Sequence, residues 1–365
     1  MTAPRLEVDL DAVEANTRSL VDRLAPVGIR VTGVTKAGLG SGDLGAAMLR
    51  GGAVGLGDSR VENLARLQAA GVIAARTLIR SPMTSQVEAV VRHASTSLNT
   101  ERSVLEALSR AAVRLGTTHA VVLMVELGDL REGVLTADLV PLARVVEGLA
   151  GLTLAGIGTN LACQSGVVPD QDKMDSLSRL AVDVEVAVGA PLSVVSGGNS
   201  ANLGWALSTT DPGRVDELRL GESILLGLDP LTRVPVPGLR TDAIALWAEL
   251  IEVRTKPSVP WGTIAQSAFG AVLPRSSAGP TVRQGILALG RQDVDPEDLV
   301  PPPGVTVLGA SSDHLVVDLA QHDGAVGDEL AFGVGYSALL RAMTSPFVSV
   351  EETALTAPTV MPRVS

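Results

Sequence analysis

Cysteine and aromatic residues are scarce in this sequence. Among 365 residues there are one cysteine, Cys163, one tyrosine, Tyr336, and an aromatic content of 2%. A single cysteine excludes an internal disulfide, and the first residues lack the basic start and apolar run of a signal peptide, so we expect a cytoplasmic protein. Because aromatic side chains are so few, the core must be aliphatic.

Long apolar runs and basic patches are also missing. No apolar run approaches the roughly 20 residues that cross a bilayer, so we expect no membrane-spanning segment. The net charge is −11 at pH 7, and an acidic protein without a basic patch repels nucleic acids and anionic membranes. We therefore expect neither as a partner. A chain of this length with 46% hydrophobic residues can form two domains.

Short aliphatic or β-branched runs alternate with segments of helical periodicity from residue 29 onward, which is typical of a parallel sheet wrapped by helices. The predicted strands are 31–35, 53–57, 77–80, 96–99, 120–127, 152–159, 192–197 and 217–226. Eight strands separated by helices predict a TIM barrel. A strand and a helix precede it, and Asp11 is the predicted N-cap of that helix.

The sequence pattern changes near residue 232, where the proline-rich stretch "TRVPVPGLR" is followed by predicted short strands separated by turns. This pattern predicts a β-rich second domain. We therefore expect a barrel over residues 11–232 and a β-rich domain over residues 233–365, with residues 1–10 able to pair into the latter.

Three features of the barrel indicate chemistry. Lys36 closes the first barrel strand, so it points into the mouth where TIM barrels place their active sites, although a lysine at a strand end often only reaches solvent. After the seventh strand, "SGGNS" supplies Gly198 for close backbone approach and Asn199 and Ser200 as donors, ahead of a helix N-terminus that suits an anion. By itself this stretch is an ordinary turn and cap.

The third feature is Arg219, at the end of the eighth strand in "LRLGES". A neutral lysine amine can form a Schiff base with pyridoxal phosphate, and an arginine can donate to the pyridine nitrogen of that cofactor while keeping its own proton. The alternative is an arginine in an ordinary ion pair with Glu217 or Glu222.

The chain resembles the alanine racemase superfamily of fold-type III pyridoxal-phosphate enzymes, and within it the ornithine racemase branch. The resemblance covers about residues 5–350. It rests on "GVTKAG", "DSRVENL", "VELGDLREG", "GIGTNLAC", "SGGNSANL", "LRLGESILLG", "KPSVP", "GRQDV", "LGASSDHL" and "GYSALLRAMTS", in this order.

The resemblance implies roles for several residues. Lys36 would carry pyridoxal 5′-phosphate as a Schiff base and serve as one of two acid/base groups, and Arg131 would orient the cofactor and the substrate carboxylate. The residues implied to bind the cofactor are Lys36, Asn160, Gly198, Asn199, Ser200, Arg219, Gly221, Glu222 and Tyr336. The resemblance further implies a head-to-tail homodimer in which each barrel mouth is closed by the partner's β-domain.

The sequence departs from the alanine racemase pattern at the second base. That enzyme uses a tyrosine opposite the lysine, but the matching place here holds Trp261, which cannot transfer a proton at neutral pH. Leu39 stands near the place of a further tyrosine that helps to hold the phosphate, and Asn160 takes the place of a histidine beside the ring. The pocket is therefore not that of an ordinary alanine racemase.

Two candidates for the missing base are Cys163, just beyond the sixth strand, and His314 beside Asp313 in "SSDHL". Thiols and imidazoles can both act as acid and base, but a lone cysteine is usually a buried hydrophobe and an Asp-His pair is usually a surface contact. Asp293 and Asp313 are candidates for contacts with a basic substrate, although acidic loop residues are usually only solvated.

The leading hypothesis is a racemase for ornithine or another basic amino acid, and an alanine racemase is the alternative. A fold-type III decarboxylase is a further alternative, but that class places an acid at the pyridine nitrogen and a cysteine in the β-domain, whereas this chain has Arg219 and no cysteine after Cys163. A non-catalytic pyridoxal-phosphate carrier shares the barrel and the lysine but lacks a β-domain such as residues 233–365.

Overall fold

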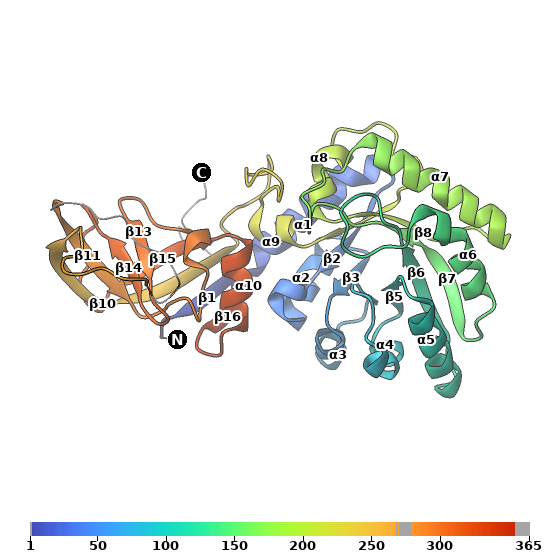
Figure 1. The fold of residues 1–365 in the computed structure, drawn as a ribbon, viewed down its shortest axis with the longest axis horizontal. Helices are drawn as coiled ribbons and strands as arrows, with labels where there is room; N and C mark the ends of the chain where they lie inside the picture. Colours follow the sequence, from blue (N-terminus) through green and yellow to red (C-terminus); the bar gives the residue numbers. More distant parts are fainter. Residues whose placement is uncertain (1, 268, 270–278, 355–365) are drawn as a thin grey trace. The chain divides into compact units, whose positions relative to one another are not determined.

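The computed structural model describes residues 2–267, 269 and 279–354. The chain divides into two compact units, one formed by Leu10–Thr241 and the other by Met1–Asp9 together with Asp242–Ser365 (Figure 1). Each unit has its own sheet. None of the described helices is long and apolar enough to cross a membrane.

The first unit is a closed barrel of eight parallel strands, so the predicted TIM barrel is confirmed. The strands are β2 (Arg30–Val34), β3 (Gly55–Asp58), β4 (Ala75–Leu78), β5 (Thr96–Asn99), β6 (His119–Met124), β7 (Leu152–Gly158), β8 (Val194–Gly198) and β9 (Glu217–Leu220). Pairing of β2 with β9 closes the ring, with Arg30 opposite Glu217. A cluster of Leu98, Val122 and Met124 packs among the strands.

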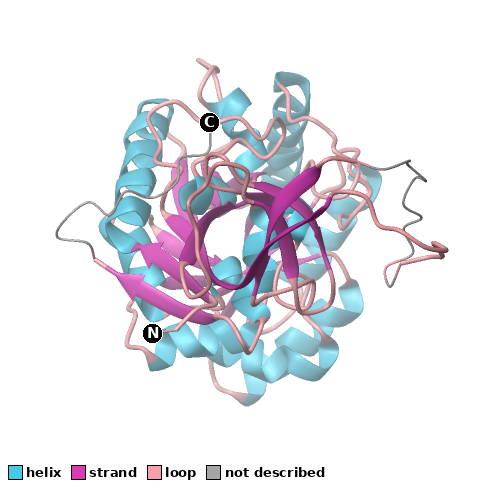
Figure 2. Cartoon of the chain, turned by 90° about the vertical axis from the view of Figure 1, so that its left-hand side faces the viewer, coloured by secondary structure: helices cyan, strands magenta, loops and turns pink. Residues whose placement is uncertain are grey.

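Helices cover the outside of the barrel (Figure 2). They are α1 (Leu10–Leu24), α2 (Gly42–Arg50), α3 (Val61–Ala69), α4 (Val87–His93), α5 (Arg102–Arg114), α6 (Thr136–Glu147), α7 (Gln171–Val188), α8 (Leu203–Ala206) and α9 (Glu222–Leu226). The helix α5 shows why these segments are helical, because its buried residues Val104, Leu105 and Leu108 recur on one face at helical spacing.

Three local predictions were wrong. The last barrel strand ends at Leu220 rather than 226, because the chain turns at Gly221 and forms α9. The strand β2 ends at Val34, so Lys36 lies two residues beyond it and begins a short 3-10 helix, η2 (Lys36–Gly38). Asp11 is not an N-cap but lies in the first turn of α1, where its charge still favours the helix dipole.

The second unit is a mainly antiparallel sheet in which six strands follow the order β12-β15-β10-β11-β14-β13. The strands of this unit are β1 (Arg5–Asp9), β10 (Ile244–Pro257), β11 (Thr281–Leu287), β12 (Leu299–Val300), β13 (Thr306–Ala310), β14 (Leu315–Asp318), β15 (Glu329–Val334) and β16 (Ser349–Thr353), with the helix α10 (Tyr336–Thr344). The strand β1 pairs with β10 and, in parallel, with β16. In register, Leu246 faces Leu6 and Phe332, all fully buried, and each such side chain contributes about 1.5–3 kcal/mol.

A histidine is buried in the barrel wall. His119 begins β6, is 1% exposed, and its Nε2 lies 2.8 Å from Ser97 Oγ on β5. Burial lowers the pKa of His119 from 6.5 to about 4, because the charged ring would lose its water. The ring is therefore neutral in the folded protein at neutral pH.

We predict that His119 makes the fold sensitive to mild acid. The unfolded chain binds this proton near pH 6.5 and the folded chain near pH 4. The stabilisation is therefore complete above pH 6.5 and falls by about 3 kcal/mol as the pH drops to 4. Denaturant unfolding of the wild type and His119→Asn between pH 7 and 4 measures this loss. Glu185, whose pKa Arg214 lowers from 4.5 to about 2, loses its stabilising effect only as the pH falls through 4.5 and below, in the wild type and the variant alike. An equal slope in His119→Asn would contradict the assignment.

Candidate active site

Residues from the carboxyl ends of the parallel strands form the candidate site. Lys36 follows β2, Arg131 lies between β6 and α6, Asn160 and Cys163 follow β7, and Gly221 follows β9. Because all eight strands of a closed parallel barrel run in one direction, their carboxyl ends share one mouth. The fold therefore brings together residues that are far apart in the sequence.

The turn that carries Lys36 is fastened to the neighbouring strand. The backbone N–H of Thr35 donates to Gly57 O at 2.9 Å, and Thr35 Oγ1 donates to Asp58 Oδ2 at 2.8 Å. Leu39 ends the turn in the left-handed region, with φ of 53°. These contacts hold the backbone of half-buried Lys36 at the edge of the barrel mouth.

The turn after β8 meets the turn after β9 at one hydroxyl. Ser200 begins the 3-10 helix η4 (Ser200–Asn202), and its Oγ accepts from the N–H of Gly221 at 3.4 Å and of Ser223 at 3.3 Å. Asn199 and Asn202 form a reciprocal capping box at the start of this helix. The arrangement gathers hydroxyl and backbone N–H groups at a helix start, which suits an anionic group such as a phosphate.

Gly198 is required by the geometry of that turn. Its φ is 143°, and a Cβ at this position would lie 2.2 Å from Asn202 Oδ1, the atom that accepts from Asn199 N–H. A larger residue would have to displace the capping box.

Arg219 is a fully buried cation in β9. It is 4% exposed, donates to Thr159 O at 2.9 Å and to Ser196 Oγ, and reaches Asn160 Oδ1 at 3.5 Å. Burial lowers the pKa of Arg219, while the negative charge of Glu217 opposes this effect. A guanidinium held in this way has lost most of its freedom to move before any ligand arrives.

Asn199 joins three groups of the mouth through one nitrogen. Its Nδ2 donates to Leu161 O at 2.9 Å, to Asn160 Oδ1 at 3.0 Å and to Cys163 Sγ at 3.3 Å. The Nδ2 of Asn160 is buried and has no hydrogen-bond partner among the described residues. A buried donor without a partner costs free energy, so this position favours a ligand that accepts a hydrogen bond.

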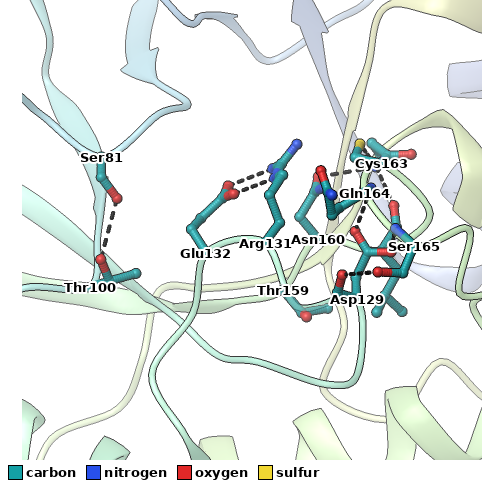
Figure 3. A network of polar contacts seen from close by, with 12 residues as sticks. Ser81, Thr100, Asp129, Arg131, Glu132, Thr159, Asn160, Cys163, Gln164 and Ser165 are labelled. Carbon is teal, nitrogen blue, oxygen red and sulfur yellow. Dashed lines mark hydrogen bonds and ion pairs between the residues drawn. The ribbon is translucent and has the colours of Figure 1, made fainter.

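Arg131 pairs with its neighbour in sequence, Glu132, through both Nε and Nη2 (Figure 3). Burial lowers the pKa of Arg131, but the hydrogen bonds and charge of Glu132 outweigh it and raise the pKa overall. Cys163 lies close enough to Arg131 and to Arg219 to interact with both charges. One thiol and two guanidinium groups therefore share the mouth.

The chain is similar to known proteins in sequence and in fold. Residues 8–230 match the family model described as alanine racemase, N-terminal domain. The chain belongs to the alanine racemase family. The resemblance seen in the sequence is therefore confirmed, and so is the membership in a family of amino-acid racemases.

Two curated relatives of this alanine racemase family chain cover nearly all of it. The lysine racemase of Thermotoga maritima is 36% identical over 95% of this chain and 98% of its own length. The ornithine racemase of Acetoanaerobium sticklandii is 34% identical over 95% of this chain and 99% of its own. Racemases are isomerases, so the enzyme class expected from the sequence agrees with these relatives.

Solved structures share the fold of this chain. The alanine racemase of Streptomyces lavendulae superposes with a TM-score of 0.76 at 21% identity, over 97% of this chain and 98% of that one. The D-threonine aldolase of Filomicrobium marinum gives a TM-score of 0.72 at 20% identity, over 94% and 88%. Racemases and an aldolase thus share this two-part architecture.

Five residues that the sequence singled out lie in the second unit of this alanine racemase family chain. They are Trp261, Asp293, Asp313, His314 and Tyr336. Tyr336 begins α10, and Trp261 is 83% exposed. His314 Nδ1 lies 3.0 Å from Asp313 Oδ1 at an exposed turn.

Two predicted residues already have protein partners. Asp293 is buried, with one oxygen accepting from Ser345 Oγ at 2.8 Å and the other from the N–H of Gly290 at 3.1 Å, so its carboxylate holds a turn together. Glu222 forms an ion pair with Arg233.

Sequence reasoning missed three acidic residues of the barrel. Asp58, Asp129 and Glu132 each hold a turn or a cation of the mouth through side-chain hydrogen bonds. All three stand within motifs that were quoted for the family, so their place beside the strand ends was the available signal. The groups that these carboxylates bind could not be predicted, because they depend on how the loops pack.

We predict that Gly198→Ala damages the turn after β8. The new Cβ would collide with Asn202 Oδ1, and alanine is strained at this φ, so the free energy of unfolding should fall by about 1–3 kcal/mol. Gly204→Ala is the matched control, because nothing lies within 4 Å of its Cβ position and it lies in α8. Denaturant unfolding compares the two, and equal stabilities would refute the role of Gly198.

Proposed function

We propose that this protein is a pyridoxal-phosphate-dependent racemase of a basic amino acid, ornithine or lysine. The observation that carries the proposal is the convergence of Lys36, the Ser200–Gly221 seat and Arg219 at one barrel mouth. The similarity to a lysine racemase and an ornithine racemase over 95% of the chain supports the choice of substrate.

The residues of the mouth fit pyridoxal phosphate. Ser200 and Gly221 would hold its phosphate, Arg219 its pyridine nitrogen and Lys36 its aldehyde carbon. The fit is supported by the meeting of Ser200 Oγ with the N–H groups of Gly221 and Ser223 at one point of the mouth. It is also supported by the buried Nδ2 of Asn160, a donor without a protein partner among the described residues. When bound, pyridoxal phosphate withdraws electrons from the substrate amine and so acidifies the Cα–H bond.

Arg219 sets how strongly that withdrawal acts. An arginine donates a hydrogen bond without giving up its proton, so it leaves a ring nitrogen unprotonated. The buried guanidinium is already fixed by Thr159 O and Ser196 Oγ, so it would need little rearrangement to donate to a ring nitrogen. Arg219 would therefore hold the ring by a hydrogen bond without supplying a proton to it.

Arg131 would bind the substrate carboxylate. Glu132 occupies Nε and Nη2, while Nη1 has no hydrogen-bond partner among the described residues. The guanidinium thus keeps one nitrogen for a ligand, and a carboxylate is its natural partner. Holding the carboxylate at one point fixes the orientation of Cα.

Racemisation needs one proton-transfer group on each face of Cα. We assign these roles to Lys36 Nζ and Cys163 Sγ. Cys163 is supported by its place in the mouth, by the hydrogen bond from Asn199 and by the two nearby arginine charges. A thiol is a chemical group that can exchange a proton with Cα at Sγ. His314 stands in the other unit and is the alternative that the experiment distinguishes.

We further propose a homodimer, as the family resemblance implies. Large apolar side chains of the second unit are exposed, among them Trp261 at 83% and Phe347 at 69%, which is typical of an interaction surface when such residues gather. Sedimentation velocity should give twice the chain mass at micromolar concentration. A monomer at all concentrations would contradict the dimer.

We predict that the protein exchanges the Cα proton of ornithine and lysine with inversion. NMR in deuterated buffer with pyridoxal phosphate follows the exchange, and chiral chromatography follows the product, for L- and D-ornithine, lysine and alanine. Lys36→Ala should abolish both signals. Cys163→Ser should lower the rate of inversion by about 10²–10⁴-fold, the usual contribution of a general acid or base, and His314→Ala tests the alternative base.

Each other result selects a different function. Inversion of alanine alone would indicate an alanine racemase, and release of CO₂ would indicate a decarboxylase. Absence of exchange with every amino acid, although Lys36 binds the cofactor, would indicate a carrier. Loss of inversion in His314→Ala and not in Cys163→Ser would move the second base to His314.

A further inference from the structure

Two loops of the barrel mouth carry the groups assigned to the substrate. Residues 125–135 follow β6 and include Arg131, and residues 159–170 follow β7 and include Cys163. Loops of this length on a surface are usually mobile. A racemase needs both groups in a constant position, because a shift of about 1 Å can lower the rate 10²-fold.

One carboxylate joins these two loops. Asp129 is 1% exposed, and its two oxygens accept from the N–H of Gln164 at 2.9 Å and of Ser165 at 3.0 Å (Figure 3). In the reverse direction, Ser165 Oγ donates to the carbonyl oxygen of Asp129 at 2.7 Å. The N–H of Val167 adds a longer hydrogen bond to Asp129 Oδ1, at 3.5 Å. Four hydrogen bonds therefore join the loop after β6 to the loop after β7.

The backbone around Asp129 is shaped for this contact. Gly128 has φ of 117° and Leu130 has φ of 55°, so left-handed residues flank the aspartate on both sides. Leu130 is a large side chain in an unfavourable conformation and is 75% exposed, so its own packing does not explain the strain. The chain bends at Asp129, and the carboxylate contacts the second loop.

The charge of Asp129 strengthens the contact. Burial raises the pKa of Asp129, but the N–H groups of Gln164 and Ser165 and the charge of Arg131 outweigh burial, so the pKa is lowered overall. The carboxylate is therefore ionised at neutral pH, and hydrogen bonds to an ionised acceptor are stronger than neutral ones.

The contact extends into the rest of the mouth. Cys163, directly before Gln164, accepts from Asn199 Nδ2, and Asn199 also contacts Asn160, which reaches Arg219. A loop fixed at Asp129 thus presents its thiol to a side chain that is itself fixed by the turn after β8.

We propose that Asp129 is a positioning residue that fixes the Arg131 loop and the Cys163 loop relative to each other. Arg131, which binds the substrate carboxylate, and Cys163, the second base, are thereby held around the same Cα. This inference rests on the proposed racemase function for its catalytic consequence. The connection between the loops is a separate, structural claim.

The first test measures the loops without catalysis. Hydrogen–deuterium exchange with mass spectrometry reports protection of the Gln164 and Ser165 N–H groups. Asp129→Asn retains one acceptor oxygen but sets an NH₂ against the other N–H, so protection of these two groups should fall by about tenfold or more. Ser165→Ala removes the reverse hydrogen bond and should loosen the same peptide. Unchanged protection in both variants would overturn the proposal.

Asp216→Asn is the matched control. Asp216 also accepts from a backbone N–H, that of Val195 at 2.9 Å, but it lies just before β9, at the amino end of the barrel. This variant should leave the exchange of residues 163–167 and the catalytic rates within about twofold of the wild type. Equal effects of Asp216→Asn and Asp129→Asn would reduce the role of Asp129 to general stability and overturn the proposal.

The second test separates positioning from folding by its product. In Asp129→Asn, Lys36 still acts on one face while Cys163 is misplaced, so Cα exchange with retention should persist as inversion falls at least tenfold, and KM should rise because Arg131 moves. An equal fall in the rates of Cα exchange with retention and with inversion would overturn the positioning role. If the wild type shows no exchange at all, the proposed function fails, while the exchange of the Gln164 and Ser165 amides still decides whether Asp129 joins the loops.

Discussion

Closure of a parallel sheet is the constraint on which this molecule depends. Once β2 pairs with β9, all eight strands must end at the same mouth, and every loop that follows a strand meets its neighbours there. Lys36, Arg131, Asn199 and Gly221 are separated by long stretches of sequence, yet closure places all of them at one mouth. The chemistry of the site is a consequence of strand direction before it is a consequence of any one residue.

Within that mouth, buried charges are made tolerable by fixed dipoles and nearby acids. Arg219 is buried and contacts a carbonyl and a hydroxyl, and Glu217 adds a negative charge at a distance. Burying a cation is costly unless such groups compensate it. The compensation leaves Arg219 oriented in advance, which is what binding of a flat aromatic ring requires. Arg131 is held in the same sense by Glu132.

Much of the architecture could be predicted from the sequence because the signals are local. Alternation of aliphatic strands with amphipathic helices predicted the barrel, and β5 was predicted at its observed bounds, residues 96–99. Errors arose where a local pattern has two outcomes. Residues 222–226 are apolar enough for a strand, but Gly221 lets the chain turn into α9. Asp11 resembles an N-cap, but α1 begins one residue earlier, at Leu10.

The sequence by itself determined the types of group available: a lysine after the first barrel strand, a glycine-rich turn after the seventh, an arginine in the eighth and a single thiol. Only the tertiary structure decided which polar side chains bind other protein groups, and the acidic residues show this. Asp293 is committed to Gly290 and Ser345, whereas Asp129 joins two loops and Glu132 holds Arg131. The physical reason is that a hydrogen bond requires its two atoms to lie within about 3 Å. That distance follows from how distant segments pack and is not encoded in any local pattern.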